Sequence, residues 1–149
     1  MTEIRKANPS DLPAIKACAF DAYAIYVDRI GREPAPMVAD FAASIERSRL
    51  HVALEDGQLA GFVVFYPQRD HVHLENVAVN PGFQRRGIGS RLVAFVEQAA
   101  RQDGFGRVEL YTNARMTENL ELYPRLGYER FDRRVEDGFD RIYFCKTLD

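Results

Sequence analysis

Cysteine is scarce in this sequence, which holds only Cys18 and Cys145, far apart and without companion cysteines. Such a pair suits neither a disulfide framework nor a zinc site of the CxxC type. We therefore predict two buried or inert thiols and no structural metal, with a reactive nucleophile as the alternative for either cysteine.

An excess of charge of one sign is also missing, because 20 lysines and arginines stand against 22 aspartates and glutamates, for a formal net charge of -2. This balance gives no general attraction to nucleic acid, so we expect no nucleic-acid partner. Any anion-binding site must be local, and a small phosphorylated ligand fits that condition better than DNA.

Long apolar runs are absent as well. No stretch approaches the roughly 20 residues that a membrane-spanning helix needs, and the N-terminal residues MTEIRKANPS lack the apolar core of a signal peptide. We therefore expect no membrane association and a cytoplasmic protein.

The sequence does contain enough apolar material for one core, since 46% of its 149 residues are hydrophobic and 11% are aromatic. This length and composition predict a single domain over residues 1–149. Periodicity predicts the order strand, helix, helix, three strands, helix, strand, helix, two strands. The predicted strands cover residues 2–7, 51–54, 59–66, 72–79, 107–112, 128–135 and 139–147. The first predicted helix begins at residue 12, with Ser10 as its N-cap, and the other three cover residues 37–49, 88–102 and 117–126.

Two Asp-Gly pairs, Asp56-Gly57 and Asp137-Gly138, stand between apolar runs, which is a strong signal for β-hairpins. Hairpins mixed with crossover helices favour a mixed sheet over a purely parallel one. We therefore predict an α+β fold, a three-layer α/β/α sandwich whose mixed, largely antiparallel sheet has about seven strands, with four helices. The C-terminal hairpin also offers a sheet edge on which a homodimer could form.

The segment from Asn80 to Ser90 reads NPGFQRRGIGS and joins a predicted strand to a predicted helix. It combines glycines, two arginines and a helix N-terminus, so it exposes several backbone N–H groups next to positive charge. Such a loop favours a phosphate, and a solvated turn before a capped helix is the alternative. A dinucleotide-binding GxGxxG motif would need a third glycine here, and the GxxxxGK[ST] spacing of a P-loop does not occur.

Within this segment, Gln84–Gly89 (QRRGIG) resembles the Q/R-x-x-G-x-G/A signature of the GNAT superfamily of acyl-CoA N-acyltransferases. Leu74–Pro81 (LENVAVNP) is similar to the family's fourth strand and its exit. Leu122–Tyr128 (LYPRLGY) is similar to the family's "L-Y-x-x-x-G-F/Y" helix end. The resemblance covers roughly residues 60 to 130, and the order of predicted elements agrees over nearly the whole chain.

The resemblance implies acetyl-CoA as cosubstrate and a place for each of its parts. The pyrophosphate would lie on the loop and helix start formed by Gln84, Arg85, Arg86, Gly87, Ile88, Gly89 and Ser90. The pantetheine arm would follow the backbone of Val77, Ala78 and Val79, because the family's fourth and fifth strands splay apart. Many members contact this arm with an asparagine where this chain has Met116. Asn119, one turn later, either replaces that asparagine or only satisfies local backbone groups.

Two residues of the predicted strand 72–79 are candidates for acid–base chemistry. Strict alternation would place His73, Glu75 and Val77 on one face of this strand. The positions of His73 and Glu75 also resemble those at which members of the family carry their catalytic Glu or His. We expect Glu75 to accept the proton of the attacking amine, directly or through water, with His73 as relay or alternate. An exposed polar strand face and a metal site are the alternatives.

Tyr123 is at the position of a family tyrosine whose hydroxyl reaches the sulfur of coenzyme A, and a phenol is a suitable proton donor to a departing thiolate. We expect Tyr123 to be the general acid. The alternative is a core aromatic, because Leu120, Tyr123 and Leu126 follow helical spacing.

Together these motifs imply an N-acetyltransferase that moves an acetyl group from acetyl-CoA to a primary amine of a small molecule, by direct attack in a ternary complex. Two alternatives share the fold. One is a non-catalytic CoA-binding sensor or regulatory domain, and the other is a protein- or O-directed acyltransferase.

Overall fold

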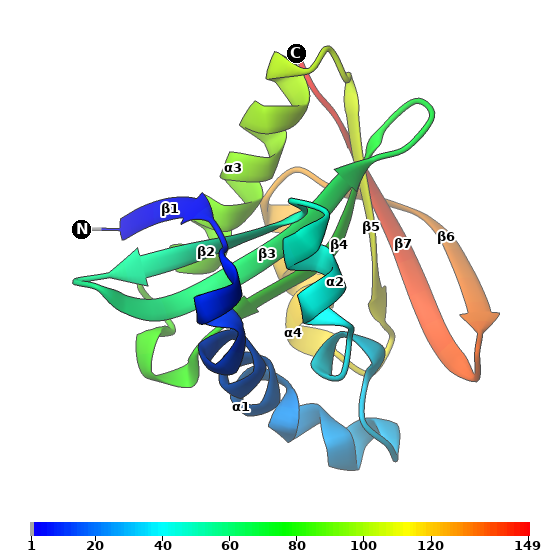
Figure 1. Ribbon diagram of the computed structural model, residues 1–149. Helices are drawn as coiled ribbons and strands as arrows, with labels where there is room; N and C mark the ends of the chain where they lie inside the picture. The colour runs from blue at the N-terminus through cyan, green and yellow to red at the C-terminus, as the bar shows by residue number, and fades with distance from the viewer. Residues whose placement is uncertain (1) are drawn as a thin grey trace.

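The fold is built on one seven-stranded sheet with the strand order β1-β2-β3-β4-β5-β7-β6. The computed structural model describes residues 2–149, and Figure 1 shows helices packed against this sheet. β4 and β5 are parallel, and the other neighbouring pairs are antiparallel. This mixed, largely antiparallel sheet with four α-helices confirms the predicted architecture. The elements are β1 (Thr2–Lys6), α1 (Leu12–Ile30), α2 (Phe41–Glu46), β2 (Leu50–Glu55), β3 (Gln58–Pro67), β4 (Val72–Val79), α3 (Ile88–Gln102), β5 (Arg107–Asn113), α4 (Thr117–Arg125), β6 (Glu129–Glu136) and β7 (Phe139–Thr147).

Both predicted hairpins form at their Asp-Gly pairs. Asp56 (φ 52°) and Gly57 (φ 82°) have left-handed backbone conformations, as do Asp137 (φ 51°) and Gly138 (φ 79°). Two successive left-handed residues form a turn whose twist matches that of the flanking strands. β2 with β3 and β6 with β7 are therefore antiparallel neighbours, as the sequence predicts.

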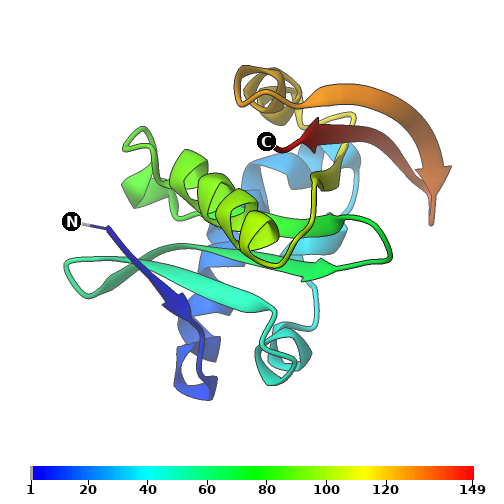
Figure 2. The ribbon, with the colours of Figure 1, turned by 90° about the horizontal axis from the view of Figure 1, so that it is seen from above.

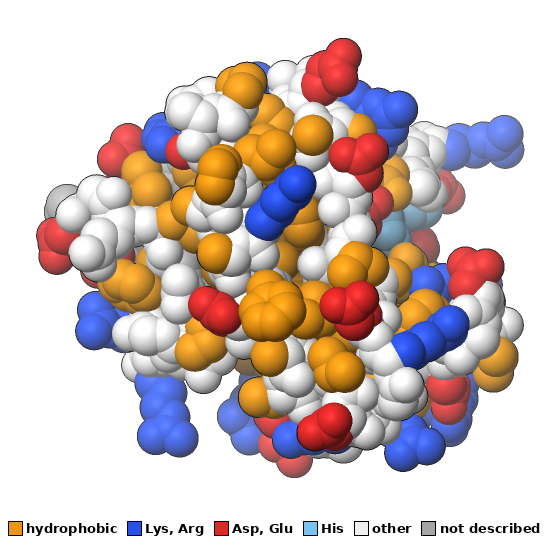
Figure 3. Space-filling view, turned by 60° about the horizontal axis from the view of Figure 1, so that its bottom comes forward, with side chains coloured by type: hydrophobic (Ala, Val, Ile, Leu, Met, Phe, Trp, Pro, Cys, Tyr) orange, Lys and Arg blue, Asp and Glu red, His pale blue; other side chains and the backbone are white. Residues whose placement is uncertain are grey.

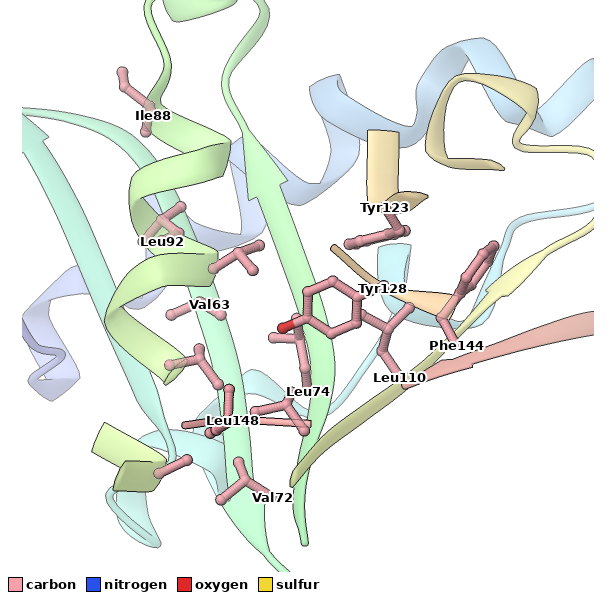
Figure 4. Close-up of a cluster of buried hydrophobic side chains, with 14 of the residues drawn as sticks. Val63, Val72, Leu74, Ile88, Leu92, Leu110, Tyr123, Tyr128, Phe144 and Leu148 are labelled. Carbon is pink, nitrogen blue, oxygen red and sulfur yellow. The ribbon is translucent and has the colours of Figure 1, made fainter. Parts of the chain in front are cut away.

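Helices cover both faces of the sheet, and each face has its own buried core. α1 and α2 pack on one face, where Ile15, Phe41 and Phe62 are buried. α3 and α4 cover the other face, and Figure 4 shows that core, to which α3 contributes Leu92 and α4 contributes Tyr123. Figure 2 shows α2 and α3 on opposite sides of β2 and β3. The layers are therefore helix, sheet and helix.

The first helical region differs from the prediction at its start. Ser10 is not the N-cap. Asn8 begins a 3-10 turn (η1, Pro9–Asp11), and its amide donates a hydrogen bond to the Asp11 carboxylate at 2.9 Å. Asp11 thereby fixes the entry of the chain into α1. In the part of the chain that the structure describes, no helix is long and apolar enough to cross a membrane.

The second predicted helix, over residues 37–49, is much shorter in the structure. α2 has only six residues. Asp40 sets its start by accepting a hydrogen bond from the Ala43 amide at 3.1 Å. Ser48, with a left-handed φ of 58°, then turns the chain into β2. Capping and this turn override the longer apolar periodicity.

β4 and β5 separate after a short parallel contact. Val72–Leu74 of β4 pair with Val108–Leu110 of β5. Beyond Leu74, the β4 edge that faces β5 has no strand partner among residues 2–149. The splay that the family resemblance implies is therefore confirmed. It leaves backbone N–H and C=O groups that need another hydrogen-bond partner.

A β-bulge interrupts β4 where the two strands part. In the register with β3, Leu74 faces Phe65 and Asn76 faces Val64, so Glu75 is the extra residue. A bulge bends its strand and redirects the side chains around it. Glu75 is therefore positioned by the same irregularity that ends the β4–β5 pairing.

The bulge also reverses the alternation of side chains along β4. Before it, Leu74 packs in the core under α3, and beyond it Val77 packs against that core while Ala78 faces α1. The prediction that Val77 shares a face with His73 and Glu75 is therefore wrong. One inserted residue moves every later side chain to the opposite face.

The sheet ends at β1 on one side and at β6 on the other. β6 carries two large exposed apolar side chains, Phe131 (42% exposed) and Val135 (74% exposed). Homodimer formation on this C-terminal hairpin stays a prediction.

Candidate active site

A cleft of about 490 Å³ opens where β4 and β5 part. Much of its lining comes from the loop between α1 and α2, from the end of β3, from the middle of β4 and from the end of β5. Tyr123 also lines it, although this residue belongs to the core under α3 and α4. The cleft therefore reaches through the gap between the strands and is lined by both Glu75 and Tyr123.

Glu75 lines the cleft from the bulge of β4. Its Oε1 atom accepts a hydrogen bond from the Tyr66 hydroxyl at 3.2 Å. Burial and this neighbouring carboxylate raise the pKa of Tyr66 to about 12, so the phenol stays protonated and donates to Glu75. The carboxylate is thus oriented by one neutral donor and keeps further acceptor capacity toward the cleft.

Asn76, the next residue, is a site residue that sequence reasoning missed. It is buried (4% exposed), and its Oδ1 atom lies 2.7 Å from the Tyr23 hydroxyl of α1. Its Nδ2 atom donates to the carbonyl of Pro36 at 3.0 Å. These bonds tie the wall of the cleft to the bulge. The available signal was an amide directly before the apolar run Val77–Val79 of a predicted strand, where a buried polar group needs partners.

Tyr123 projects from α4 with its ring packed 5.9 Å from the rings of Tyr128 and Phe144. Its side chain is buried (4% exposed), and its hydroxyl has no hydrogen-bond partner among residues 2–149. Burial, with a smaller contribution from Tyr26, raises the pKa of Tyr123 well above its usual value. The hydroxyl therefore keeps its proton at neutral pH and is free to donate it in the cleft.

His73 lies next to this site without lining the cleft. Its ring centre is 5.4 Å from that of Tyr66 and 5.6 Å from that of Tyr111, and it borders a second cavity that continues from the cleft. Burial, with a smaller contribution from His71, lowers the pKa of His73 to about 4. His73 is therefore a neutral imidazole at physiological pH, in contact with the tyrosine that orients Glu75.

The loop before α3 has the form of an anion cradle. After a 3-10 turn (η3, Pro81–Phe83), Arg85 (φ 67°) and Gly87 (φ 76°) are both left-handed, which turns successive amides in one direction. None of the backbone amides of residues 85–90 donates a hydrogen bond to another residue in the range 2–149. These N–H groups and the N-terminus of α3 favour an anion.

The side chains around this loop suit the same use. Gln84, Arg85, Arg86 and Ser90 are exposed, whereas Ile88 is buried and anchors the helix start in the core.

The cradle continues directly into the free edge of β4. A Cβ atom added to Gly89 would lie 3.5 Å from Cγ2 of Val79, so the helix start packs on the end of the strand. Val77, Ala78 and Val79 belong to the part of β4 that β5 does not pair. The Val77 carbonyl lies 2.9 Å from the Tyr23 hydroxyl, which uses one of its two acceptor positions.

Asn119 and Met116 both line the cleft, and Met116 is otherwise buried (3% exposed). The Nδ2 atom of Asn119 donates to Oγ1 of Thr112 at 3.1 Å, and its amide plane is thereby oriented next to the cleft. Its side chain bonds to no backbone group among residues 2–149, so the alternative of local backbone satisfaction is not what the structure shows, and contact with the pantetheine arm stays a prediction.

The cysteines and possible metal ligands lie elsewhere or do not gather. Cys18 is buried, and burial raises the pKa of its thiol to about 12, while Cys145 also has a raised pKa for the same reason. Neither lines the cleft. Within residues 2–149, no three His, Cys, Asp or Glu side chains are placed to hold a metal ion. On the face in Figure 3, acidic and basic side chains are interspersed and form no single basic patch.

Known proteins share this sequence pattern over most of the chain. The family model of the acetyltransferase (GNAT) family matches residues 16–128. A protein named "Probable N-acetyltransferase 14", from Xenopus tropicalis, is 32% identical over 89 residues, or 58% of this chain and 43% of that protein. The aminoalkylphosphonate N-acetyltransferase of Salmonella typhimurium is 31% identical over 99 residues, or 60% of this chain and 64% of that protein. The matched region therefore spans about half to two thirds of the length of these relatives.

Solved structures show the same fold. The PaiA N-acetyltransferase from Thermoplasma acidophilum, determined in complex with coenzyme A, superposes with a TM-score of 0.79 at 18% identity and over 99% of both chains. The fold of this chain is thus a known architecture. Because the family model covers most of its length, the chain belongs to the acetyltransferase (GNAT) family.

Proposed function

We propose that the protein transfers an acetyl group from acetyl-CoA to a primary amine of a small molecule, by direct attack within a ternary complex. One observation carries the proposal. A continuous surface runs from the open amides of residues 85–90, along the free edge of β4, to a cleft lined by Glu75 and Tyr123. In that order, these parts suit a pyrophosphate, a pantetheine arm and a thioester. The names of the relatives, which are N-acetyltransferases, support the same activity.

The groups that this chain leaves open would hold the cosubstrate. The amides of residues 85–90 would bind the pyrophosphate, with Arg85 or Arg86 adding a charged contact and Gln84 a polar one. The backbone of Val77–Val79 would pair with the amides of the pantetheine arm as with an added strand. The carboxamide of Asn119 would border the arm from α4.

Acetyl-CoA supplies the acetyl group as a thioester: the amine nitrogen bonds to the carbonyl carbon, and the carbon–sulfur bond breaks. Glu75 accepts the proton that the amine loses, directly or through a water molecule. The Tyr123 hydroxyl, which burial keeps protonated, gives its proton to the departing thiolate. Both groups then exchange protons with solvent. Alignment of the two reactants in the cleft lowers the barrier further.

His73 has an indirect part in this scheme. It contacts Tyr66, whose hydroxyl donates to Glu75. We therefore assign it to positioning Glu75, or to relaying its proton outward, rather than to contact with the amine.

Two substitutions test the assignment of the proton-transfer groups. Glu75→Gln and Tyr123→Phe should each lower kcat about 100- to 10,000-fold, because each removes one proton-transfer group while conserving shape. The affinity for coenzyme A, measured by calorimetry, should stay within a few-fold of the wild-type value. Glu121→Gln is the matched control, since this glutamate is exposed on α4 and its loss should leave turnover unchanged.

The alternatives make different predictions in the same assays. A sensor domain would bind coenzyme A and release none from acetyl-CoA in the presence of any amine. An O- or protein-directed enzyme would release coenzyme A only when alcohols or peptides replace small amines. Full turnover by Tyr123→Phe would rule out this tyrosine as the acid.

A further inference from the structure

Three arginines line the cleft, namely Arg47 and Arg49 from the segment before β2 and Arg141 from β7. Arg141 already has acidic partners, because its guanidinium lies 3.6 Å from Glu136 and 4.0 Å from Asp137. Within the described range 2–149, Arg47 and Arg49 form no ion pair. Two positive charges therefore border the cleft without a counter-ion from this chain.

Arg49 is held in a defined position. Its amide donates to the Ser44 carbonyl at 2.9 Å, and its carbonyl accepts from the Phe65 amide at 3.0 Å. Its guanidinium carbon lies 4.2 Å from the centre of the Tyr66 ring. Stacking uses the face of the planar guanidinium and leaves the N–H groups at its rim free for a bidentate contact with an anion.

The position of Arg49 associates it with the acceptor rather than with the phosphates of coenzyme A. Arg49 and Glu75 both contact Tyr66, because the guanidinium lies over its ring and its hydroxyl donates to Glu75. Tyr66 pairs with His73 near the start of β4, whereas the phosphate loop follows Val79 at the end of that strand. At roughly 3.3 Å per residue, these two places are about 20 Å apart. One pyrophosphate cannot reach both.

The acidic groups of the cleft do not neutralise these arginines. Among residues 2–149, the carboxylates that line the cleft are Asp40 and Glu75. Asp40 accepts the Ala43 amide as the N-cap of α2, at 3.1 Å, and Glu75 accepts the Tyr66 hydroxyl. A ligand with its own negative charge would complete the site.

From this arrangement we infer that the acceptor is a small amine that also carries a compact anion, a carboxylate or a phosphonate. Arg49, assisted by Arg47, binds the anion and places the amine about one ring width away, at Glu75. This inference rests on the proposed function, because it concerns the acceptor of the same cleft. A neutral alkylamine would leave both guanidiniums unpaired and would bind more weakly.

The test compares amines of similar size with and without the anion. β-Alanine and 2-aminoethylphosphonate form the anionic arm, propylamine and β-alaninamide form the neutral arm, and release of coenzyme A is the readout. We expect kcat/KM for the better anionic amine to exceed that for the neutral amines about 10- to 100-fold. Comparison within the anionic arm distinguishes carboxylate from phosphonate.

Variants assign the preference to its residue. Arg49→Gln should remove most of the preference through a higher KM, with kcat nearly retained, and Arg47→Gln should remove part of it. Arg69→Gln removes the same charge from the exposed turn between β3 and β4 and should leave the preference unchanged. Affinity for coenzyme A should be equal in all three variants, since the phosphate loop is remote from each change.

Several outcomes would overturn the inference. Equal use of neutral and anionic amines would do so while leaving the proposed function intact, as would an equal effect of Arg49→Gln and Arg69→Gln. If no amine is acetylated, the proposed function fails. Calorimetry of β-alanine and 2-aminoethylphosphonate with the protein loaded with coenzyme A then still tests the anion site. Binding weakened by Arg49→Gln supports the anion site, and no binding by the wild type rejects it.

Discussion

His73 and Tyr123 show how burial acts on single residues in opposite directions. Burial disfavours the charged form of a side chain, so it lowers the pKa of His73 to about 4 and raises the pKa of Tyr123. Both groups are therefore neutral at physiological pH. Burial therefore keeps the proton on Tyr123 but makes the phenol a weaker acid, and it makes His73 a weak base and a poor first acceptor for an ammonium proton.

The pKa of His73 predicts a dependence of stability on pH. Between pH 6.5 and about 4 the unfolded chain binds a proton at this histidine and the folded chain does not, so the free energy of unfolding falls as pH is lowered through this range. We expect His73→Gln to remove this contribution, at most about 1.4 kcal/mol per pH unit. Urea unfolding of both proteins at pH 7.5 and pH 5.0 measures it.

The comparison isolates His73 because the other acid-sensitive groups remain in both proteins. His51, whose pKa burial also lowers, contributes equally to each. Parallel stability curves for wild type and variant between pH 7.5 and pH 5.0 would show that His73 is not protected from protonation.

Among the elements, β4 is the one on which the proposed function depends most. It pairs with β3 along its whole length except at the bulge of Glu75, but β5 pairs only with its first three residues, Val72–Leu74. Its remaining edge therefore offers hydrogen-bonding groups at fixed spacing to an extended ligand. The loop and α3 that follow add the open amides at the end of this edge.

Hydrogen exchange can test this use of β4. We expect saturating coenzyme A to slow the exchange of backbone amides in residues 75–79 and 85–90, by up to about 100-fold when the ligand stands at 100 times its dissociation constant. β1 (Thr2–Lys6), none of whose residues lines the cleft, serves as the internal control and should exchange unchanged. Protection confined to other segments would place the cosubstrate elsewhere.

For the whole molecule, a buried polar network joins α3, α4 and β7. Glu97 of α3 is 7% exposed and accepts hydrogen bonds from the Tyr128 hydroxyl at 2.9 Å and from Lys146 of β7 at 3.1 Å. Lys146 also donates to the carbonyl of Leu126, at the end of α4, at 2.9 Å. The helix that carries Tyr123 is thereby fixed to both the sheet and α3.

Removal of one partner should destabilise the fold. Lys146→Met leaves the Glu97 carboxylate buried without its cation, and we expect a loss of about 2 kcal/mol in the free energy of unfolding. This value lies below that for a fully buried pair, because the Lys146 side chain is 27% exposed. Chemical denaturation measures this loss of stability. Because the network fixes α4, which carries Tyr123, we expect kcat of the variant to fall as well.

A double variant and a surface pair complete this test. Glu97→Leu with Lys146→Met removes both charges and should recover much of the stability. Arg125→Gln breaks the pair with Glu121, whose side chains are 75% and 77% exposed, and should change stability little. Equal effects of Lys146→Met and Arg125→Gln would contradict a structural role for the buried network.

The sequence by itself determined the parts whose conformation depends on near neighbours. Asp-Gly pairs imposed both hairpins, and the glycines and arginines of residues 84–90 marked an anion loop, because backbone preference and charge act within a few residues. The resemblance of three short motifs to the family implied acetyl-CoA from QRRGIG, Glu75 from LENVAVNP and Tyr123 from LYPRLGY.

Only the tertiary structure decided how these parts meet. The bulge at Glu75 depends on the register of β4 against β3, and that register moved Val77 to the other face. The roles of Asn76 and Arg49 depend on Tyr23 and Tyr66, which are distant in sequence. Burial, which sets the acidity of His73 and Tyr123, is likewise a property of the packed molecule and not of a short stretch of chain.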